Sequence, residues 1–260
     1  STIPLDEKSS ALQSSSVEKI VTDFVEGVLP STYLIVDCSR SLRTRNLSAR
    51  VAAALSLKGL VDEMHFLLED AGDASSIRLD VLEQVCEQQE ALLIYGFTWI
   101  LWNFLEAVEC NPAAASMLHG KRIILVHSGG WKKLEAIKVD RDTFEIKARE
   151  ISGGYAQVID FYGLVEQVGI IYPECRHGYR HVPAWADIII RDPFTHESLE
   201  GRNGQIQLLN TLAFGAPYHS VLTEDMGQIE PGPCACGRRS KRFILDGRMP
   251  KAEIRGCANV

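Results

Sequence analysis

The feature that most constrains the fold of this chain is an alternation of short apolar runs that end in glycine with segments of helical spacing. Residues 91–95 (ALLIY) have the pattern of a buried strand that ends at Gly96, and residues 99–109 follow with helical spacing. The pattern recurs at 122–127 (RIILVH), which precedes a Ser-Gly-Gly turn. Strands that are bounded by glycine and alternate with helices predict a largely parallel sheet.

The two halves of the chain differ in their patterns. Before about Tyr155 we predict further helices at 17–28, 48–60 and 77–89, and a short strand at 34–36. After Tyr155, short β patterns separated by Pro and Gly turns predominate, at 186–193, 204–209 and 243–255. We therefore predict the α/β class, with a mostly parallel sheet flanked by helices and a β-rich second half.

The charge balance argues against a nucleic-acid partner. The 260 residues carry 27 Lys and Arg against 34 Asp and Glu, a formal net charge of −7, and the dense basic run is short: Arg238, Arg239, Lys241 and Arg242. Binding to a polyanion draws its affinity from clustered cations that displace counterions. Hydrophobic residues make up 46% of the chain, which is enough for a sizeable core.

The sequence shows neither a membrane span nor a secretory leader. The most apolar stretch, residues 91–102, has about a dozen residues, whereas a spanning helix needs roughly 20. We interpret it as a core segment or a pocket wall. Residues 1–16 are polar and lack an apolar h-region, and the seven cysteines, an odd number, argue against a disulfide framework. We expect a cytoplasmic protein.

Turn motifs, rather than a phosphate-binding fingerprint, carry the chemistry of this sequence. Neither G-x-x-x-x-G-K-[ST] nor G-x-G-x-x-G occurs, and the motifs that do occur lie in order at 128–132, 160–166, 223–225 and 247–248. The paired glycines of the first motif allow a ligand to lie flat against the backbone; alternatively they form an ordinary turn. Glu166 has the hard oxygens that bind a divalent cation; alternatively it is a solvated carboxylate at a helix start.

Taken in order, these motifs resemble the adenylate-forming superfamily, which activates carboxylic acids with ATP. Residues 162–166 (YGLVE) are similar to its Tyr-Gly-x-x-Glu signature, and residues 247–248 (GR) to its hinge Gly-Arg. Residues 223–225 (TED) resemble its Thr-Gly-Asp signature, with Glu224 in place of glycine.

Within this superfamily the chain most resembles the acyl-protein synthetases of bacterial luminescence (LuxE-type, long-chain-fatty-acid ligases) and their relative phenylacetate-CoA ligase. The segments that carry the resemblance are 127–134, 160–167, 233–238 and 247–257, so it spans nearly the whole chain. It implies an adenylate-forming (ANL) α/β domain over residues 1–246, followed by a hinge and C-terminal tail at 247–260. Because the family has a Ser/Thr/Gly-rich phosphate loop before a segment similar to residues 1–6, we expect that loop upstream and the domain incomplete at its N-terminus.

The resemblance also implies the reaction. A fatty or other carboxylic acid would be converted with ATP and Mg²⁺ to acyl-AMP and transferred to a cysteine thiol of the protein, with an acyltransferase and a reductase as partners. The alternatives are an aryl- or acyl-CoA ligase of the phenylacetate-CoA ligase type, an acyl-activating enzyme of polysaccharide or secondary-metabolite assembly, and a non-catalytic binding domain with the same fold.

The resemblance assigns roles to individual residues. The nucleotide would contact Ser128, Gly129 and Gly130 along the adenine, Tyr162 and Gly163 near it, and Asp225 and Arg248 around the ribose. The catalytic residues would be Glu166, which would hold Mg²⁺, together with Lys132 and Cys257. Cations beside the phosphates offset the charge repulsion that opposes attack by a carboxylate on the α-phosphate.

The cysteines offer two further hypotheses. Four residues have the chemistry for a structural Zn²⁺ ion, namely Cys175, His181, Cys234 and Cys236, with His177 as an alternative fourth ligand. Phenylacetate-CoA ligase-like chains have a similar Cys and His placement, but the C-x-C spacing is tight for zinc, and unrelated thiols are the alternative. Cys257 matches the C-terminal cysteine that acyl-protein synthetases acylate, and Arg255 would favour its thiolate. Its alternative is an inert terminal thiol.

Overall fold

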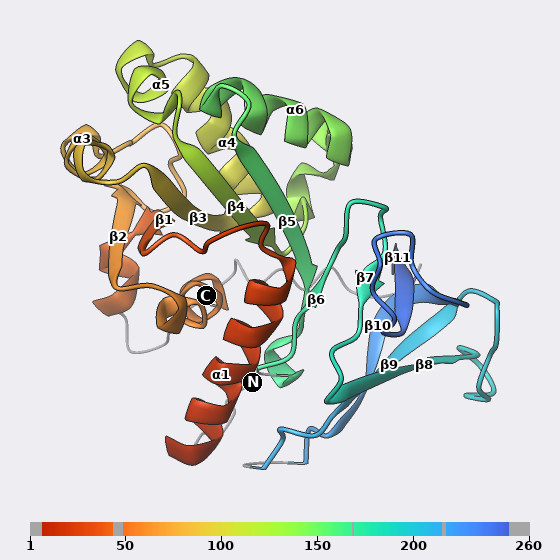
Figure 1. Ribbon diagram of the computed structural model, residues 1–260. Coiled ribbons are helices and arrows are strands. Elements are labelled where there is room, and N and C mark those ends of the chain that lie inside the picture. The colour runs from red at the N-terminus through yellow and green to blue at the C-terminus, as the bar shows by residue number, and fades with distance from the viewer. Residues whose placement is uncertain (1–6, 44–48, 168, 215–216, 250–260) are drawn as a thin grey trace. The chain divides into compact units, whose positions relative to one another are not determined.

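Two compact units make up the part of the chain that the computed structural model describes, namely residues 7–43, 49–167, 169–214 and 217–249 (Figure 1). We call residues 25–160 the parallel unit and residues 7–24 with 161–249 the antiparallel unit, after the strand pairing that predominates in each. The strand β5, which lies between β4 and β6, begins in the parallel unit and ends in the antiparallel unit.

The parallel unit is built on a sheet of buried strands. Their bounds are Thr32–Cys38 (β1), Glu63–Leu68 (β2), Ala91–Phe97 (β3), Arg122–Ser128 (β4) and Ala156–Tyr162 (β5), in the spatial order β2-β1-β3-β4-β5. The ladders β1–β2, β1–β3 and β3–β4 are all parallel. Every residue of β1, and all but the first of β3 and of β4, are buried, because the strands of a parallel sheet are covered on both faces.

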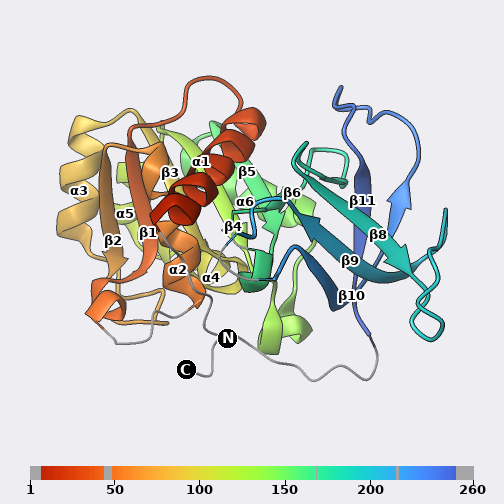
Figure 2. The ribbon, with the colours of Figure 1, turned by 90° about the horizontal axis from the view of Figure 1, so that it is seen from below.

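Helices cover this sheet. They are α2 (Ala49–Leu55), α3 (Leu79–Gln88), α4 (Thr98–Glu109), α5 (Pro112–Leu118) and α6 (Arg141–Ser152), with the 3₁₀ turns η1 (Ser39–Arg43), η2 (Lys58–Leu60) and η3 (Lys132–Ile137). Helices α3, α5, α4 and α6 pack against one another in one layer (Figures 1 and 2). Helix α4 follows β3 directly and packs on β1, β3 and β4, so that Ile100, Phe104 and Val108 are buried.

The antiparallel unit contains a five-stranded sheet in the order β7-β11-β10-β9-β8. The strands are β7 (Arg180–His181), β8 (Ala186–Arg191), β9 (Gly204–Asn210), β10 (Ser220–Glu230) and β11 (Arg242–Arg248), and each ladder is antiparallel. The unit also holds α1 (Glu7–Phe24), η4 (Val165–Gln167) and β6 (Tyr172–Pro173), which pairs with the last two residues of β5. Its core gathers Tyr172, Ile188, Ile206 and Phe243, all fully buried.

The predicted fold class is confirmed, and the differences concern the ends and number of helices and the strands β2, β5 and β10, which were not predicted. The motif at 223–225, which was predicted as a turn, lies within β10. The helix predicted at 17–28 is α1, which begins at Glu7 and ends at Phe24. Its polar first half lacks an amphipathic pattern, yet Gln13 and Ser16 are buried, so tertiary packing sets where the helix begins. The helix predicted at 48–60 is α2, which ends at Leu55.

Helices α5 and α6 were not predicted, although both carry capping signals. The side chain of Asn111 accepts a hydrogen bond from the N–H of Ala114 at the start of α5, and Asp140 accepts from the N–H of Thr143 at the start of α6. The strand predicted at 243–255 is confirmed as β11 up to Arg248. Met249 lies beyond the strand, and residues 250–255 lie outside the described residues. Among the described helices, none is long and apolar enough to cross a membrane.

Candidate functional site

The Ser-Gly-Gly turn after β4 exposes its backbone. Ser128 is buried and shares a hydrogen bond of 3.0 Å with the hydroxyl of Tyr95, whereas Gly129 and Gly130 are exposed, with φ angles of 84° and 61°. No atom lies within 4 Å of where a Cβ of Gly130 would stand. The turn therefore offers an accessible, flat backbone at the carboxyl edge of a parallel sheet, where α/β folds bind ligands. Lys132 begins η3, and its side chain lies outside the described part of the chain.

The buried side chain of His127 makes polar contacts at the same end of β4. Nδ1 of His127 lies 3.1 Å from the hydroxyl oxygen of Thr98 and 3.4 Å from a carboxylate oxygen of Asp160. Because the Thr98 hydroxyl also donates to the carbonyl of Ser128 at 3.1 Å, its oxygen is left to accept from Nδ1–H. His127 and Asp160 were not among the predicted site residues. The signal that could have found them is their place at the ends of β4 and β5.

Three predicted nucleotide-binding residues lie in contact in the antiparallel unit. The hydroxyl of Tyr162 donates to Oδ2 of Asp225 at 2.7 Å, and Nε of Arg248 lies 3.6 Å from Oδ1 of the same carboxylate. Asp225 stands opposite Arg248 in the β10–β11 ladder, which fixes their distance. Burial, and next the negative charge of Asp225, raise the pKa of the Tyr162 phenol, so that it remains a hydrogen-bond donor. We call Tyr162, Asp225 and Arg248 the carboxylate trio.

Glu166 lies in a turn close in sequence to Tyr162, one member of the carboxylate trio, and hydrogen bonds hold this turn in place. It lies half-buried in η4, four residues after Tyr162. The neighbouring Gln167 is buried, and its side chain donates to the carbonyl of Tyr218 at 2.5 Å. Gly163 is exposed, and a Cβ there would make only ordinary contacts at 3.5 Å, so space does not explain this glycine.

The common nucleotide site stays a prediction. The Ser-Gly-Gly turn belongs to the parallel unit, whereas Glu166 and the carboxylate trio belong to the antiparallel unit. Within each unit the expected residues are accessible or in contact, as described above. Cys257, the expected acyl acceptor, lies outside the described residues.

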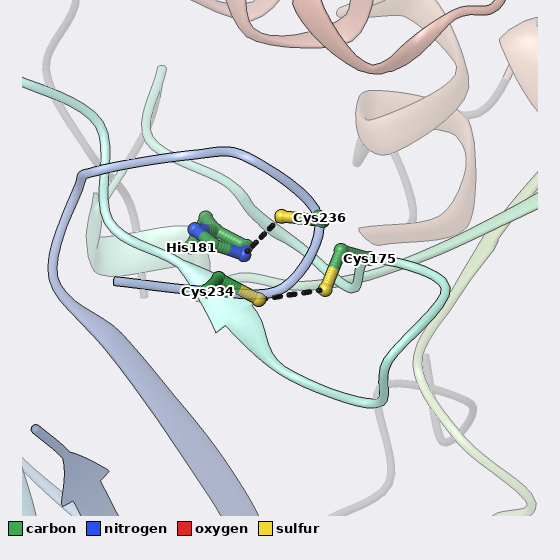
Figure 3. Close-up of side chains that lie close together, drawn as sticks. All are labelled: Cys175, His181, Cys234 and Cys236. Carbon is green, nitrogen blue, oxygen red and sulfur yellow. Dashed lines mark hydrogen bonds between the residues drawn. The ribbon is translucent and has the colours of Figure 1, made fainter. Parts of the chain in front are cut away.

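The predicted metal ligands gather at one point of the antiparallel unit (Figure 3). The ligand atoms of Cys175, His181, Cys234 and Cys236, which we call the cysteine cluster, all lie within 4.8 Å of one another. The Sγ atoms of Cys175 and Cys234 are 3.7 Å apart, and Sγ of Cys236 is 3.4 Å from Nε2 of His181. In a tetrahedral zinc site, Zn–S and Zn–N bonds of about 2.3 and 2.05 Å place two sulfurs about 3.8 Å apart and sulfur and nitrogen about 3.5 Å apart. The spacing therefore fits a tetrahedral metal ion. His177, the alternative ligand, is exposed and lies outside the cluster.

The two loops that supply the cysteines make the same turn. In the loop between β6 and β7, the N–H of Gly178 donates to the carbonyl of Cys175 at 2.9 Å. In the loop between β10 and β11, the N–H of Gly237 donates to the carbonyl of Cys234 at 3.0 Å. In both turns the cysteine N–H donates to the carbonyl four residues later, at 2.9 and 3.2 Å. Both glycines have a left-handed backbone conformation, with φ angles of 78° and 91°. Each loop thus presents its first cysteine from a rigid backbone.

Two arginines of the basic run surround the sulfurs. Arg242 hydrogen-bonds to Cys234, and Arg238 to Cys236. Burial raises the pKa of Cys234, but hydrogen bonds from the N–H of Cys236 and from Arg242 outweigh it and lower the pKa to about 7. A thiolate, the form that binds metal, is therefore well populated at neutral pH. The sequence indicates only that this basic run is too short for nucleic-acid binding, and its place beside the thiols was not predicted.

The histidine of the cluster is held in its metal-binding form. Burial, followed by the charges of Arg238 and Arg242, lowers the pKa of His181 to about 4, so that its imidazole is neutral at pH 7. Its Nδ1 lies 3.1 Å from the hydroxyl of Ser240, which directs Nε2 towards the sulfurs. The four donors together suit a closed metal site with no position left for substrate.

Comparison with known proteins gave one matching family and a set of similar structures. The family model described as acyl-protein synthetase, LuxE, matches residues 1–260. No curated protein matches the chain. Among solved structures, 2-hydroxyisobutyryl-CoA ligase with 2-HIB-AMP and CoA has a TM-score of 0.68 and 15% identity, covering 96% of this chain and 51% of that one.

Two other solved structures are similar over the same part of the chain. The luciferase-like enzyme of the mealworm Zophobas morio has a TM-score of 0.59 and 12% identity, covering 96% of this chain and 55% of that one. A putative long-chain-fatty-acid CoA ligase from Rhodopseudomonas palustris has a TM-score of 0.58 and 15% identity, with coverages of 95% and 56%. The chain thus spans about half the length of the structures it matches, and it shares their fold.

Proposed function

This chain belongs to the acyl-protein synthetase family LuxE, and from that premise we propose that it activates a long-chain fatty acid, or another carboxylic acid, with ATP to give acyl-AMP and transfers the acyl group to its own Cys257. The observation that supports the proposal most is the carboxylate trio, because residues from three separate motifs with an expected nucleotide role are in contact. The rival functions are a CoA ligase and a non-catalytic binding domain.

Asp225 is the residue that we propose for the ribose hydroxyls. Its carboxylate accepts one hydrogen bond from Tyr162 and faces Arg248, and 16% of the side chain is exposed. Two carboxylate oxygens offer about four acceptor sites, so capacity remains for the two hydroxyls of a ribose. The exposed backbone at Gly129 and Gly130 suits the flat adenine ring.

The proposed chemistry needs positive charge beside the phosphates. An oxygen of the acid attacks the α-phosphorus, pyrophosphate leaves, and the acid becomes a mixed anhydride with AMP as its leaving group. Bound Mg²⁺ would offset the repulsion between the carboxylate and the triphosphate, and the carboxylate of Glu166 is the ligand that we propose for it. We propose that Lys132 adds a further positive charge.

The second step acylates the thiol. The sulfur of Cys257 forms a bond to the acyl carbon, the bond from that carbon to the AMP oxygen breaks, and the thiol proton passes to solvent. Because this step needs a reduced thiol, we place the protein in the cytoplasm. An acyltransferase that supplies the acid and a reductase that consumes the thioester are the partners we propose.

The first test measures pyrophosphate release by the full-length protein with fatty, aryl and short-chain acids. We expect release that requires ATP, Mg²⁺ and a fatty acid. Asp225→Asn should raise the KM for ATP about tenfold or more, because a charged hydrogen-bond acceptor is lost. Asp246→Asn is the matched control on the neighbouring strand, where Asp246 contacts only the surface residue Asn203 among the hydrogen bonds described. No release with any acid would leave the binding domain as the better explanation.

The second test follows the acyl group. Labelled fatty acid should remain on the denatured protein and be absent from Cys257→Ala, while both proteins release pyrophosphate. Label that leaves as acyl-CoA when CoA is added, and that does not depend on Cys257, would favour the CoA ligase.

We also propose that the cysteine cluster binds a structural Zn²⁺ ion. Three thiolates and one Zn²⁺ leave a net charge of −1, which Arg238 and Arg242 offset from hydrogen-bond distance. The ligands come from loops about 50 residues apart, so the ion would tie β7 to the β10–β11 hairpin and stabilise the unit.

Elemental analysis of the full-length protein tests the zinc proposal. We expect one zinc per chain in the unaltered protein and in Cys110→Ser, since Cys110 is exposed and lies apart from the cluster. Cys234→Ser should contain almost none. Unaltered protein that remains metal-free after incubation with zinc would contradict the proposal.

A further inference from the structure

A hydrogen bond from the hydroxyl of Ser16 joins helix α1 to the turn that carries Glu166. Helix α1 runs alongside β6 (Figure 1). The hydroxyl of Ser16 donates to the carbonyl oxygen of Gly169 at 2.5 Å, and Nε1–H of Trp185 donates to the same hydroxyl at 2.7 Å. Ser16 is 5% exposed, so both hydrogen bonds are shielded from water. The serine therefore links the η4 turn to a residue that packs on the sheet core.

The backbone of the turn lies directly against the helix. Gly169 has a φ of 84°, and a Cβ added there would stand 2.7 Å from Cα of Gln13, closer than carbon atoms approach. Only glycine fits this contact, on grounds of both space and backbone conformation. Any shift of α1 against the turn must consequently move the backbone three residues from Glu166.

The other side of the turn is fixed as well. The buried side chain of Gln167 donates to the carbonyl of Tyr218, and the backbone carbonyl of Gln167 accepts from the N–H of Ile170 at 3.0 Å. Glu166 thus directly precedes Gln167, which contacts a loop, and lies three residues before Gly169, which contacts the helix. Of these, the Ser16 contact can be removed without changing the backbone of the turn.

We propose that Ser16 is a positioning residue for the magnesium site: through Gly169 it fixes the turn that carries Glu166. The inference rests on the proposed function, in which Glu166 binds Mg²⁺. Mg²⁺ requires near-octahedral ligands at about 2.0–2.1 Å and tolerates misplaced oxygens poorly. Residues that orient metal ligands typically change affinity about 10- to 100-fold when they are removed.

The test compares Ser16→Ala with Ser15→Ala, its exposed neighbour on α1, in the full-length protein. We expect Ser16→Ala to raise the Mg²⁺ concentration for half-maximal pyrophosphate release about tenfold, with the rate at saturating Mg²⁺ nearly unchanged. Ser15→Ala should match the unaltered protein. Trp185→Phe retains an aromatic ring but removes the N–H that donates to Ser16, so it should shift the Mg²⁺ curve in the same direction. This variant provides the test if Ser16→Ala does not fold.

Hydrogen exchange of the peptide over residues 164–170 provides a readout that needs no activity. Without nucleotide, exchange in this peptide should be faster in Ser16→Ala and Trp185→Phe than in Ser15→Ala. Unchanged exchange, or an unchanged Mg²⁺ curve in an active Ser16→Ala protein, would overturn the inference and leave the proposed function standing. Absence of pyrophosphate release from the unaltered protein would overturn the proposed function, and with it the magnesium role of Ser16.

Discussion

At the scale of single residues, two adjacent glycines shape the proposed adenine surface for different reasons. A Cβ at Gly129 would stand 3.3 Å from the ring of Phe97, so this position is restricted by space as well as by its φ of 84°. Gly130 has open space around it, and only its φ of 61° restricts it. A methyl group at Gly130 would therefore protrude where we propose that the nucleotide lies.

Gly130→Ala separates backbone strain from ligand exclusion. A left-handed alanine should lower the free energy of unfolding by about 1 kcal/mol. Gly72→Ala is the matched control, because Gly72 has a φ of 83°, nothing within 4 Å, and a place in a turn after β2. Thermal melts should show similar losses for the two variants, and only Gly130→Ala should raise the KM for ATP. Equal KM values would remove Gly130 from the adenine surface.

Residue-level prediction from the sequence was best where a motif fixed both the residue and its neighbours. Tyr162, Asp225 and Arg248 were expected around one nucleotide, and they are in contact. Glu224 was noted only as a departure from the family pattern. In the fold it forms an exposed ion pair of 2.5 Å with Arg248, a partner that depends on the β10–β11 register and so could not be inferred from the motif.

At the scale of elements, α1 is held at its C-terminal end by the loop of the cysteine cluster. The guanidinium of Arg238 lies 3.8 Å from the ring centroid of Phe24, and its Nε lies 3.1 Å from a carboxylate oxygen of Asp23. The same arginine hydrogen-bonds to Cys236. The end of the helix and the loop that carries Cys234 and Cys236 are therefore coupled through one side chain.

Arg238→Gln should loosen this end of α1. We expect amide exchange over residues 19–24 to become several-fold faster, because a stacking contact and an ion pair are lost together. Lys241→Gln is the control from the same basic run: Lys241 pairs with Asp187 rather than with the helix. Exchange that is equally fast in both variants would mean that Arg238 does not hold α1.

The sequence predicted the strands β3 and β4 but neither the strands β2, β5 and β10 nor the start of α1, and the reason is physical. The apolar runs of β3 and β4 are local signals that burial on both faces requires. The start of α1 depends on contacts such as Ser16 with Gly169, 153 residues away, which no window of sequence contains. Likewise, the presence of His181 rather than His177 in the cysteine cluster depends on where β7 lies, not on spacing along the chain.

At the scale of the whole molecule, the two compact units can differ in their free energy of unfolding. The division between them falls within β5, after Asp160, and no Pro- or Gly-rich linker marks it in the sequence. The change of pattern at about Tyr155 lies close to this division, but it predicted a β-rich half of one domain and not a second compact unit. The cysteine cluster lies wholly in the antiparallel unit, so metal binding should stabilise that unit directly.

Chelation of the metal should affect the two units unequally. After treatment with a strong chelator, we expect faster amide exchange in β7, β10 and β11, whereas β1, β3 and β4 keep their protection. Added zinc should restore the slow exchange. Uniform acceleration in all six strands would show instead that the molecule opens as one cooperative unit.

The cysteine cluster also has a consequence for how this family diverges. Structural zinc sites have four protein ligands, so the loss of one ligand weakens metal binding, and a lineage that has lost one of these side chains gains less from retaining the others. Related sequences should therefore keep Cys175, His181, Cys234 and Cys236 as a set or replace them as a set, with few intermediates. Where the set has been replaced, apolar side chains should fill the space, because the two loops then need another reason to stay together.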